Sequence, residues 1–276
     1  MKFLVPFIYF FNSRAKTILH KGSFFILILF PVMWAYYRAL EVKVVTLIDV
    51  VVFVLGFLGM FCIYEVGYLF NDVITTRFEE NPSYWFSEEK DVFSEKIEKR
   101  FEFLVYIRII LAIISGVLIS KLRPEVMVQY FVCIIGLMIS YAFHNNLRNK
   151  WNVMTDFWLQ FFKYNTLVLL VAPFSEVKLY LLLNLFTVPV LRTIEYCNKE
   201  RLNIHIFRKF NVDRLRIVYH VAMVIIGSVL YFCGIKECLF LAEISVVLFA
   251  YRCVAEVLLK NKSISDIRKK NFDKVK

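Results

Sequence analysis

Long apolar blocks alternate with shorter charged segments along almost the whole chain. Most blocks contain about 18–25 residues, which at about 1.5 Å of rise per residue is enough to cross the roughly 30 Å hydrocarbon core of a bilayer. The short alternating segments of a membrane barrel are not seen. The pattern therefore predicts an all-α, polytopic membrane protein with about eight transmembrane helices. The predicted spans are residues 23–40, 45–70, 103–120, 126–143, 156–171, 179–190, 217–233 and 239–259.

The predicted spans fall into two groups of four, residues 23–143 and 156–259. In each group the link between the second and third span is long and charged, at residues 71–102 and 191–216. We expect one transmembrane domain, residues 23–259, built from two pseudo-repeated four-helix halves. Halves of this kind commonly place a substrate site where they meet.

The two ends of the chain differ from the spans in character. Residues 1–22 contain the short apolar run LVPFIYFF followed by basic residues, which favours a helix lying at the membrane interface over a cleaved signal peptide. Residues 260–276 form a basic tail. The stretch SEEKDVFSEKIEKRFEF, before the third span, predicts an amphipathic helix because its apolar residues recur at helical spacing.

Positive charge is distributed unevenly over the predicted loops. The chain has 34 Lys and Arg against 23 Asp and Glu, a formal net charge of +11. Most of these basic residues lie in the N-terminal segment, the two long loops and the tail, so the positive-inside rule predicts a multi-pass protein with both termini cytoplasmic. Topology and attraction to anionic lipid heads explain the charge, and no nucleic-acid partner is expected. The four His and six Cys show no metal-ligand spacing.

Polar residues cluster where the second span ends, in the stretch YEVGYLFNDVITTRFEENP. Glu65, Tyr68 and Asp72 are spaced i, i+3, i+7 and share one helix face, with Asn71 on the neighbouring stripe. An ionisable side chain within a span is expected to face protein or a water-filled cavity. Glu65 is therefore expected to line a cavity, and the alternative is simple packing, with Glu65 paired to a basic residue elsewhere.

This stretch resembles the first aspartate-rich motif, N-D-x-x-D-x-x-x-D, of the UbiA superfamily of intramembrane prenyltransferases. Asn71 and Asp72 match its opening, while Thr75 and Glu79 stand where the later aspartates are expected. The layout of spans and long loops resembles the family as well. The resemblance implies that Asn71, Asp72 and Glu79 bind Mg²⁺, which carries the diphosphate of an isoprenyl donor.

The second long loop should then hold the second motif, typically D-x-x-x-D. It has no aspartate before Asp213, so Glu195 and Glu200 are the best substitutes as metal ligands. Basic residues of the two long loops are expected to contact phosphate oxygens as charge-assisted donors, with ordinary cytoplasmic charge as the alternative. The candidates are Arg77, Arg192, Lys199 and Arg201.

The fifth predicted span carries a polar stripe of Asp156, Gln160 and Lys163 at i, i+4, i+7. We expect Asp156 and Gln160 to line a central cavity and Lys163 to lie near a phosphate or acceptor; the alternative is that Lys163 snorkels to the interface. The residues expected to act in catalysis are Asp72, Lys163 and Tyr68.

The sequence therefore leads to the hypothesis of a UbiA-like intramembrane transferase. It would act on an isoprenoid lipid, a polyprenyl phosphate or diphosphate, with one Mg²⁺ at a cytoplasmic site, and transfer either a prenyl group or a phosphosugar. The loss of acidic residues at Thr75 and in the second loop leaves open a non-enzymatic lipid-binding or scaffold protein. A small transporter is a third possibility, disfavoured because Pro31 and Pro189 are isolated.

Overall fold

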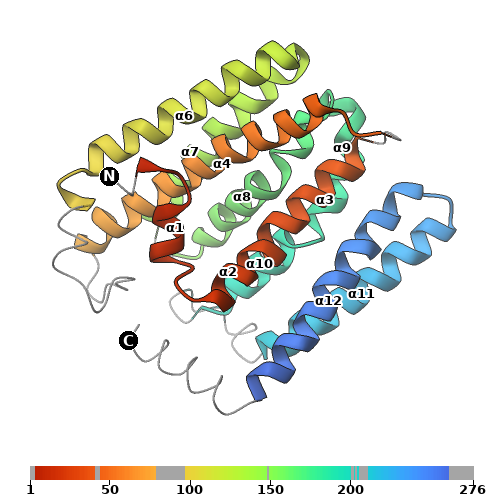
Figure 1. Cartoon of the computed structure of the whole chain (residues 1–276). Coiled ribbons are helices and arrows are strands. Elements are labelled where there is room, and N and C mark those ends of the chain that lie inside the picture. Colours follow the sequence, from red (N-terminus) through yellow and green to blue (C-terminus); the bar gives the residue numbers. More distant parts are fainter. Residues whose placement is uncertain are drawn as a thin grey trace.

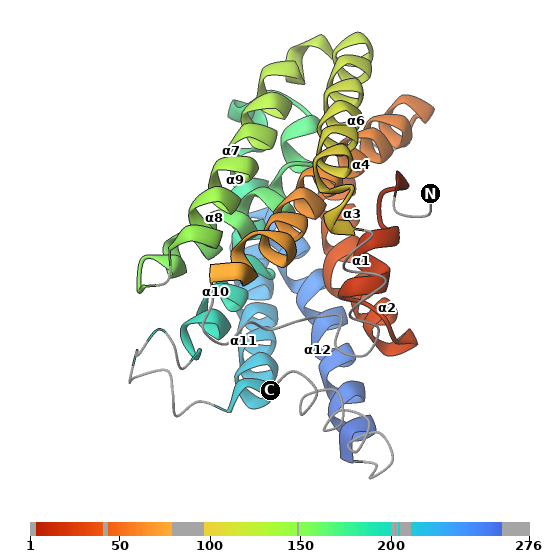
Figure 2. The same ribbon diagram turned by 90° about the vertical axis from the view of Figure 1, so that its left-hand side faces the viewer.

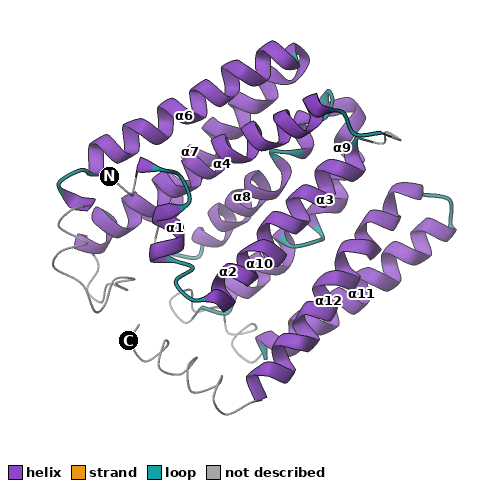
Figure 3. Ribbon diagram, viewed as in Figure 1, coloured by secondary structure: helices purple, strands orange, loops and turns teal. Residues whose placement is uncertain are grey.

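The described part of the chain is entirely helical. The computed structural model describes residues 4–40, 44–78, 97–147, 149–199, 202, 204 and 211–260, and this part contains helices, turns and loops but no strand (Figure 3). The all-α class predicted from the apolar blocks is confirmed. The α-helices are α1 (Ile8–Ser13), α2 (Ile18–Phe24), α3 (Phe30–Ala39), α4 (Leu47–Val73), α6 (Phe101–Leu122), α7 (Met127–Asn146), α8 (Asn152–Asn165), α9 (Phe174–Leu185), α10 (Pro189–Cys197), α11 (Val212–Phe232) and α12 (Leu239–Lys260).

Short segments of other helix types join several of these elements. The π-helical η2 (Phe25–Leu29) links α2 to α3 without a break. The remaining short elements are single 3₁₀ turns, η3 (Thr75–Phe78), η4 (Pro124–Val126), η5 (Val168–Leu170) and η7 (Lys236–Cys238).

Seven helical segments are long and apolar enough to cross a membrane, among the residues that the structure describes. They are Ile18–Ala39, Leu47–Phe78, Phe101–Leu122, Pro124–Asn146, Phe174–Cys197, Val212–Phe232 and Lys236–Leu258. A multi-pass membrane protein is therefore supported, while the predicted count of eight spans is not confirmed. The difference lies at residues 156–171, where α8 has only 14 residues, several of them polar, before the chain turns into η5. The two-half repeat stays a prediction.

The helices form a tilted bundle with the short helix α1 across one end (Figures 1 and 2). α4 packs against α6 and α7, α8 packs against α7 and α10, and the α11–α12 hairpin packs on α3, α9 and α10. The ends of α4, α7, α10 and α12 and the starts of α6, α8 and α11 gather at the end of the bundle nearest α1. We call this the α1 end.

A break in the sixth predicted span lies deep in the bundle. α9 stops at Leu185 and α10 begins at Pro189, which occupies the first turn of the new helix, where a missing N–H costs least. Within the break, the Thr187 hydroxyl donates to the Asn184 carbonyl at 2.7 Å, and the Asn184 side chain donates to the Tyr164 carbonyl near the end of α8 at 2.8 Å. Irregular backbone at membrane depth is tolerated where protein surrounds it in this way.

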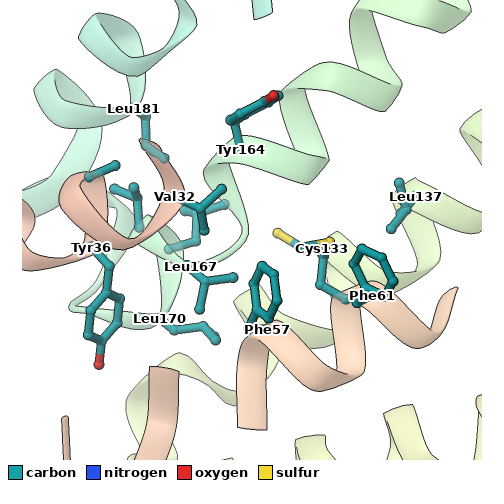
Figure 4. Packing of buried hydrophobic residues seen from close by; sticks show 14 of the residues in the cluster. Val32, Tyr36, Phe57, Phe61, Cys133, Leu137, Tyr164, Leu167, Leu170 and Leu181 are labelled. Atoms are coloured by element: carbon teal, nitrogen blue, oxygen red, sulfur yellow. The ribbon is translucent and has the colours of Figure 1, made fainter. Parts of the chain in front are cut away.

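The apolar core fills the space between α3, α4, α7 and α8. Figure 4 shows Phe57 and Phe61 of α4 facing Cys133 of α7, with Leu167 between them and Val32 of α3. These side chains are nearly or fully buried. The core thus holds the middle of the bundle together and leaves the polar side chains of interest nearer the α1 end.

The opposite end of the bundle contains a pocket of about 500 Å³ beside an ion pair. Asp49 and Thr46 form a capping box at the start of α4, and Asp49 also pairs with Arg123. Arg123 further donates to the carbonyls of Leu170 and Val171 at 3.1 and 2.8 Å. This pocket includes none of the residues predicted for the functional site.

Candidate functional site

Asp72 lies in the last turn of α4, and both of its carboxylate oxygens are held by the N-terminal segment. The Tyr9 hydroxyl donates to Oδ2 at 2.5 Å, and Arg14 donates to Oδ1 at 2.5 Å. Asn71 donates to the same Oδ1 at 3.2 Å. Burial and the nearby Asp72 carboxylate hold the pKa of Tyr9 well above its usual value, so Tyr9 stays a donor at neutral pH. The negative charge of Asp72 is therefore balanced by the Arg14 guanidinium, and the Tyr9 hydroxyl of α1 adds a hydrogen bond.

Glu65 lies two turns deeper in α4 and is completely buried. It accepts from Arg108 Nε at 2.8 Å and from the backbone N–H of Phe10 at 2.9 Å. Arg108 is also completely buried, on α6. Of the two expectations for Glu65, this matches pairing with a basic residue elsewhere in the chain. The contacts of Glu65 connect α1, α4 and α6.

Aromatic side chains cover the α4 face between Glu65 and Asp72. The Arg14 guanidinium lies 4.7 Å from the centre of the Tyr68 ring, a cation–π contact. Tyr64 meets Tyr141 of α7 edge to face at 5.1 Å. Gly67 makes this packing possible, because a Cβ there would lie 2.2 Å from the Tyr141 ring. Tyr68, one of the predicted catalytic residues, thus lies directly beside the Asp72–Arg14 ion pair.

The polar stripe of α8 faces the interior of the bundle, while its predicted role as the wall of a central cavity stays a prediction. Lys163 is only 7% exposed; its Nζ lies 3.3 Å from the Tyr64 hydroxyl and near the Tyr64 and Tyr164 rings. Gln160 makes a long 3.5 Å contact with Asp156. The Asp156 Oδ2 and Gln160 Oε1 atoms are buried without a hydrogen-bond partner among the described residues. The stripe therefore offers polar groups that the described residues do not fully satisfy.

Glu195 lies on α10 and is surrounded by arginines. Arg216 of α11 donates to both of its oxygens, at 2.6 and 2.9 Å, and Arg192 donates at 3.0 Å. The Lys199 ammonium lies 3.9 Å from the Tyr196 ring centre. Glu195 is thus held in a bidentate ion pair with Arg216. The sequence predicted Glu195 as a metal ligand and did not predict this pair.

Arg192 connects these groups across several helices. It is close enough to interact electrostatically with Tyr68 of α4, with Lys163 and Asp156 of α8, and with Arg252 of α12. We define the polar cluster as this set of neighbouring side chains at the α1 end. Its members are Arg14, Tyr68, Asp72, Asp156, Lys163, Arg192, Glu195, Arg216, His220 and Arg252.

The predicted residues are only partly brought together. Arg77 pairs with Glu98 on an exposed surface and makes no described contact with the polar cluster. Glu79, Glu200 and Arg201 lie outside the described residues, as does most of the predicted amphipathic stretch before α6. Asn71, Gln160 and Lys199 lie beside members of the cluster, whereas Glu65 is held in its own pair with Arg108.

Four members of the cluster were not among the predicted site residues. Arg14 and Arg216 looked like ordinary cytoplasmic charge, and His220 had no ligand spacing. Arg252 stood out as a charge within a span, but a pair with Glu256 one turn away explained it equally well. For Arg252, the sequence signal was a charged residue within an apolar helix.

The described residues do not make a magnesium site. Asp72 and Glu195 are each already occupied by arginine, and no group of three or more His, Cys, Asp or Glu side chains suited to a metal occurs in the described ranges. Because Glu79 and Glu200 lie outside those ranges, the prediction of Mg²⁺ remains untested.

Comparison of this chain with protein-family models, with curated proteins and with solved structures found no match.

Proposed function

We propose that this protein is an intramembrane transferase, similar in layout to the UbiA superfamily, that binds the phosphate end of an isoprenoid lipid in the polar cluster. The observation that supports this most strongly is the excess of positive charge there. Within the described ranges, five basic side chains, Arg14, Lys163, Arg192, Arg216 and Arg252, face four acidic ones, Asp72, Asp156, Glu195 and the half-exposed Asp213. The positive-inside pattern would place this end of the bundle on the cytoplasmic side.

An uncompensated charge inside a membrane domain is costly and usually serves a function. A phosphate or diphosphate group would supply the missing negative charge and accept the unused donors. An isoprenoid tail is a suitable companion for such a head group, because it would extend between apolar helices into the bilayer. The proposed ligand thus explains both the buried charge and its position in a membrane protein.

In the proposed reaction, the bond between the allylic carbon and the diphosphate oxygen breaks. The diphosphate leaves with the electron pair, and an acceptor nucleophile bonds to the carbon and gives up a proton. Lys163 and Arg192 would stabilise the negative charge on the leaving group. The rings of Tyr64 and Tyr68 would face the developing allylic cation. Transfer of a phosphosugar to a polyprenyl phosphate would use the same basic residues.

Direct binding tests this proposal. Farnesyl diphosphate, farnesol and inorganic diphosphate are titrated onto the purified protein in nanodiscs. We expect farnesyl diphosphate to bind more tightly than either fragment. Lys163→Met should weaken its binding by about tenfold or more, the value of one charge-assisted hydrogen bond. Lys178→Met is the matched control, since Lys178 is exposed on α9. Equal affinity for farnesol, or equal loss in both variants, would rule the proposal out.

A second candidate is a protein that binds the lipid without transferring it. The arginine ion pairs on Asp72 and Glu195 favour it, because both carboxylates are committed to structural contacts. Turnover separates the two candidates. A transferase releases diphosphate from labelled farnesyl diphosphate when native membranes supply the acceptor, whereas a binding protein retains the intact ligand.

A further inference from the structure

Three arginines from three different helices gather around a single carboxylate at the α1 end. Arg192 of α10 and Arg216 of α11 both donate to Glu195. Arg252 of α12 interacts electrostatically with both of these arginines and with Glu195. Glu195 offsets one of the three positive charges, and Asp213, which Arg216 also contacts, has a half-exposed side chain. The group therefore keeps an excess of positive charge on side chains that are only partly exposed.

Two buried nitrogen atoms at this place have no hydrogen-bond partner among the residues that the structure describes. They are Nε of Arg252 and Nδ1 of His220. His220 is 1% exposed and lies within electrostatic range of Arg216, Arg252 and Glu195. A buried polar atom without a partner is unusual in a folded protein and often indicates a bound ion, ligand or water. Here the unused groups lie beside surplus positive charge, which indicates an anion.

We infer that Arg192, Arg216 and Arg252 form a phosphate-binding triad, with His220 beside it, and that this triad holds the lipid phosphate without a metal ion. The inference rests on the proposed function. Guanidinium groups stay charged at all physiological pH values and match phosphate oxygens with two parallel hydrogen bonds. They thereby balance the phosphate charge, as Mg²⁺ does in the UbiA superfamily that the sequence resembles.

The contacts of the Glu195 and Asp72 carboxylates support binding without a metal ion. Mg²⁺ at Glu195 would have to displace a bidentate Arg216 contact and would add two positive charges beside the arginines. Mg²⁺ at Asp72 would have to displace both Tyr9 and Arg14. In each place an arginine already occupies the position next to the acid, so the described geometry favours anion binding over cation binding.

Binding of farnesyl diphosphate to the full-length protein is measured in nanodiscs with excess EDTA and with excess MgCl₂. We expect the same affinity in both. Arg252→Gln should weaken binding by about tenfold or more, because a charge-assisted contact is lost. Arg252→Lys should keep part of the affinity. Arg214→Gln should change nothing, since Arg214 is exposed on α11.

The melting temperature of each variant checks folding. Arg252→Gln should not lower it, because removing one of several like charges relieves repulsion in the ligand-free protein.

The outcomes separate the two proposals. Binding that requires MgCl₂ would overturn the metal-independent triad and leave the proposed function standing. Undiminished binding by Arg252→Gln in EDTA would overturn the assignment of the triad. Failure of farnesyl diphosphate to bind under either condition would overturn the proposed function itself.

Discussion

The charged side chains within the bundle are of two kinds, those paired with a group of opposite charge and those without such a partner among the described residues. The Glu65–Arg108 pair is fully buried and closed, because both partners are satisfied by each other and by nearby backbone groups. Lys163 and Arg252, by contrast, have no carboxylate bound to them in the described structure. Groups of the first kind hold helices together, and groups of the second kind are the ones to which the proposed function assigns a ligand.

The buried pair predicts a large stability difference between two identical substitutions. Glu65→Gln leaves the Arg108 charge buried without a counter-charge, which should cost about 3–5 kcal/mol. Glu98→Gln removes the same charge from the exposed pair with Arg77 and should cost less than about 1 kcal/mol. Unfolding of both variants in detergent, followed by circular dichroism, gives the comparison. Equal losses would show that the Glu65–Arg108 pair contributes no more than a surface contact.

At this scale the sequence predicted polar residues by their position within apolar helices. Asp156, Gln160 and Lys163 were found because a stripe at i, i+4, i+7 stands out in a span, and the structure buries all three. Arg14 and Arg216 were missed because their partners, Asp72 and Glu195, are distant in sequence or lie across a loop. Long-range pairing of this kind leaves no periodic signal in one sequence.

The helices themselves depend on a few close approaches. In the α11–α12 hairpin, a Cβ at Gly227 would lie 2.8 Å from the Ala242 nitrogen and 2.9 Å from the Cys238 oxygen. These are backbone atoms, which cannot rotate away as a side chain can. α11 therefore depends on Gly227 to approach α12.

Substitution of two glycines by alanine tests this contact. Gly227→Ala should destabilise the protein by about 1–3 kcal/mol, because α11 must move away from α12. Gly22→Ala on α2 meets nothing within 4 Å and should be neutral or stabilising by up to about 1 kcal/mol. Thermal unfolding of the two variants decides the matter, and a Gly227→Ala protein as stable as Gly22→Ala would refute the close approach.

The elements were predicted well where apolar runs are long, and less well where helices break. The sixth predicted span, 179–190, became α9 and α10 because Pro189 starts a new helix within a longer apolar segment. The isolated proline gave no indication that the Thr187 hydroxyl bonds to the Asn184 carbonyl in the turn before it, or that the Asn184 side chain bonds to the end of α8. The break matters because α10 carries Arg192 and Glu195 to the polar cluster.

The distribution of charge predicts how the whole molecule is oriented in the membrane. The positive-inside rule predicts that the α1 end faces the cytoplasm and that the turn between α11 and α12 faces the other side. Cys233 is exposed at this turn, while Cys62, Cys133, Cys197 and Cys238 are buried.

A membrane-impermeant maleimide applied to intact cells or right-side-out vesicles tests the orientation. It should label wild-type protein and should not label Cys233→Ser. A cysteine introduced at Lys16, which lies before α2, should react only after the membrane is permeabilised. The reverse labelling pattern would show that the protein is inserted the other way round.

The central claim is that the polar cluster holds an isoprenoid phosphate, and the lipid that copurifies with the protein tests it most directly. Wild type, Lys163→Met and Lys178→Met are purified in parallel, and the bound lipids are identified by mass spectrometry. The account predicts an isoprenoid phosphate or diphosphate with wild type and Lys178→Met and its depletion from Lys163→Met. Only bulk phospholipids, in equal amounts with all three proteins, would contradict it.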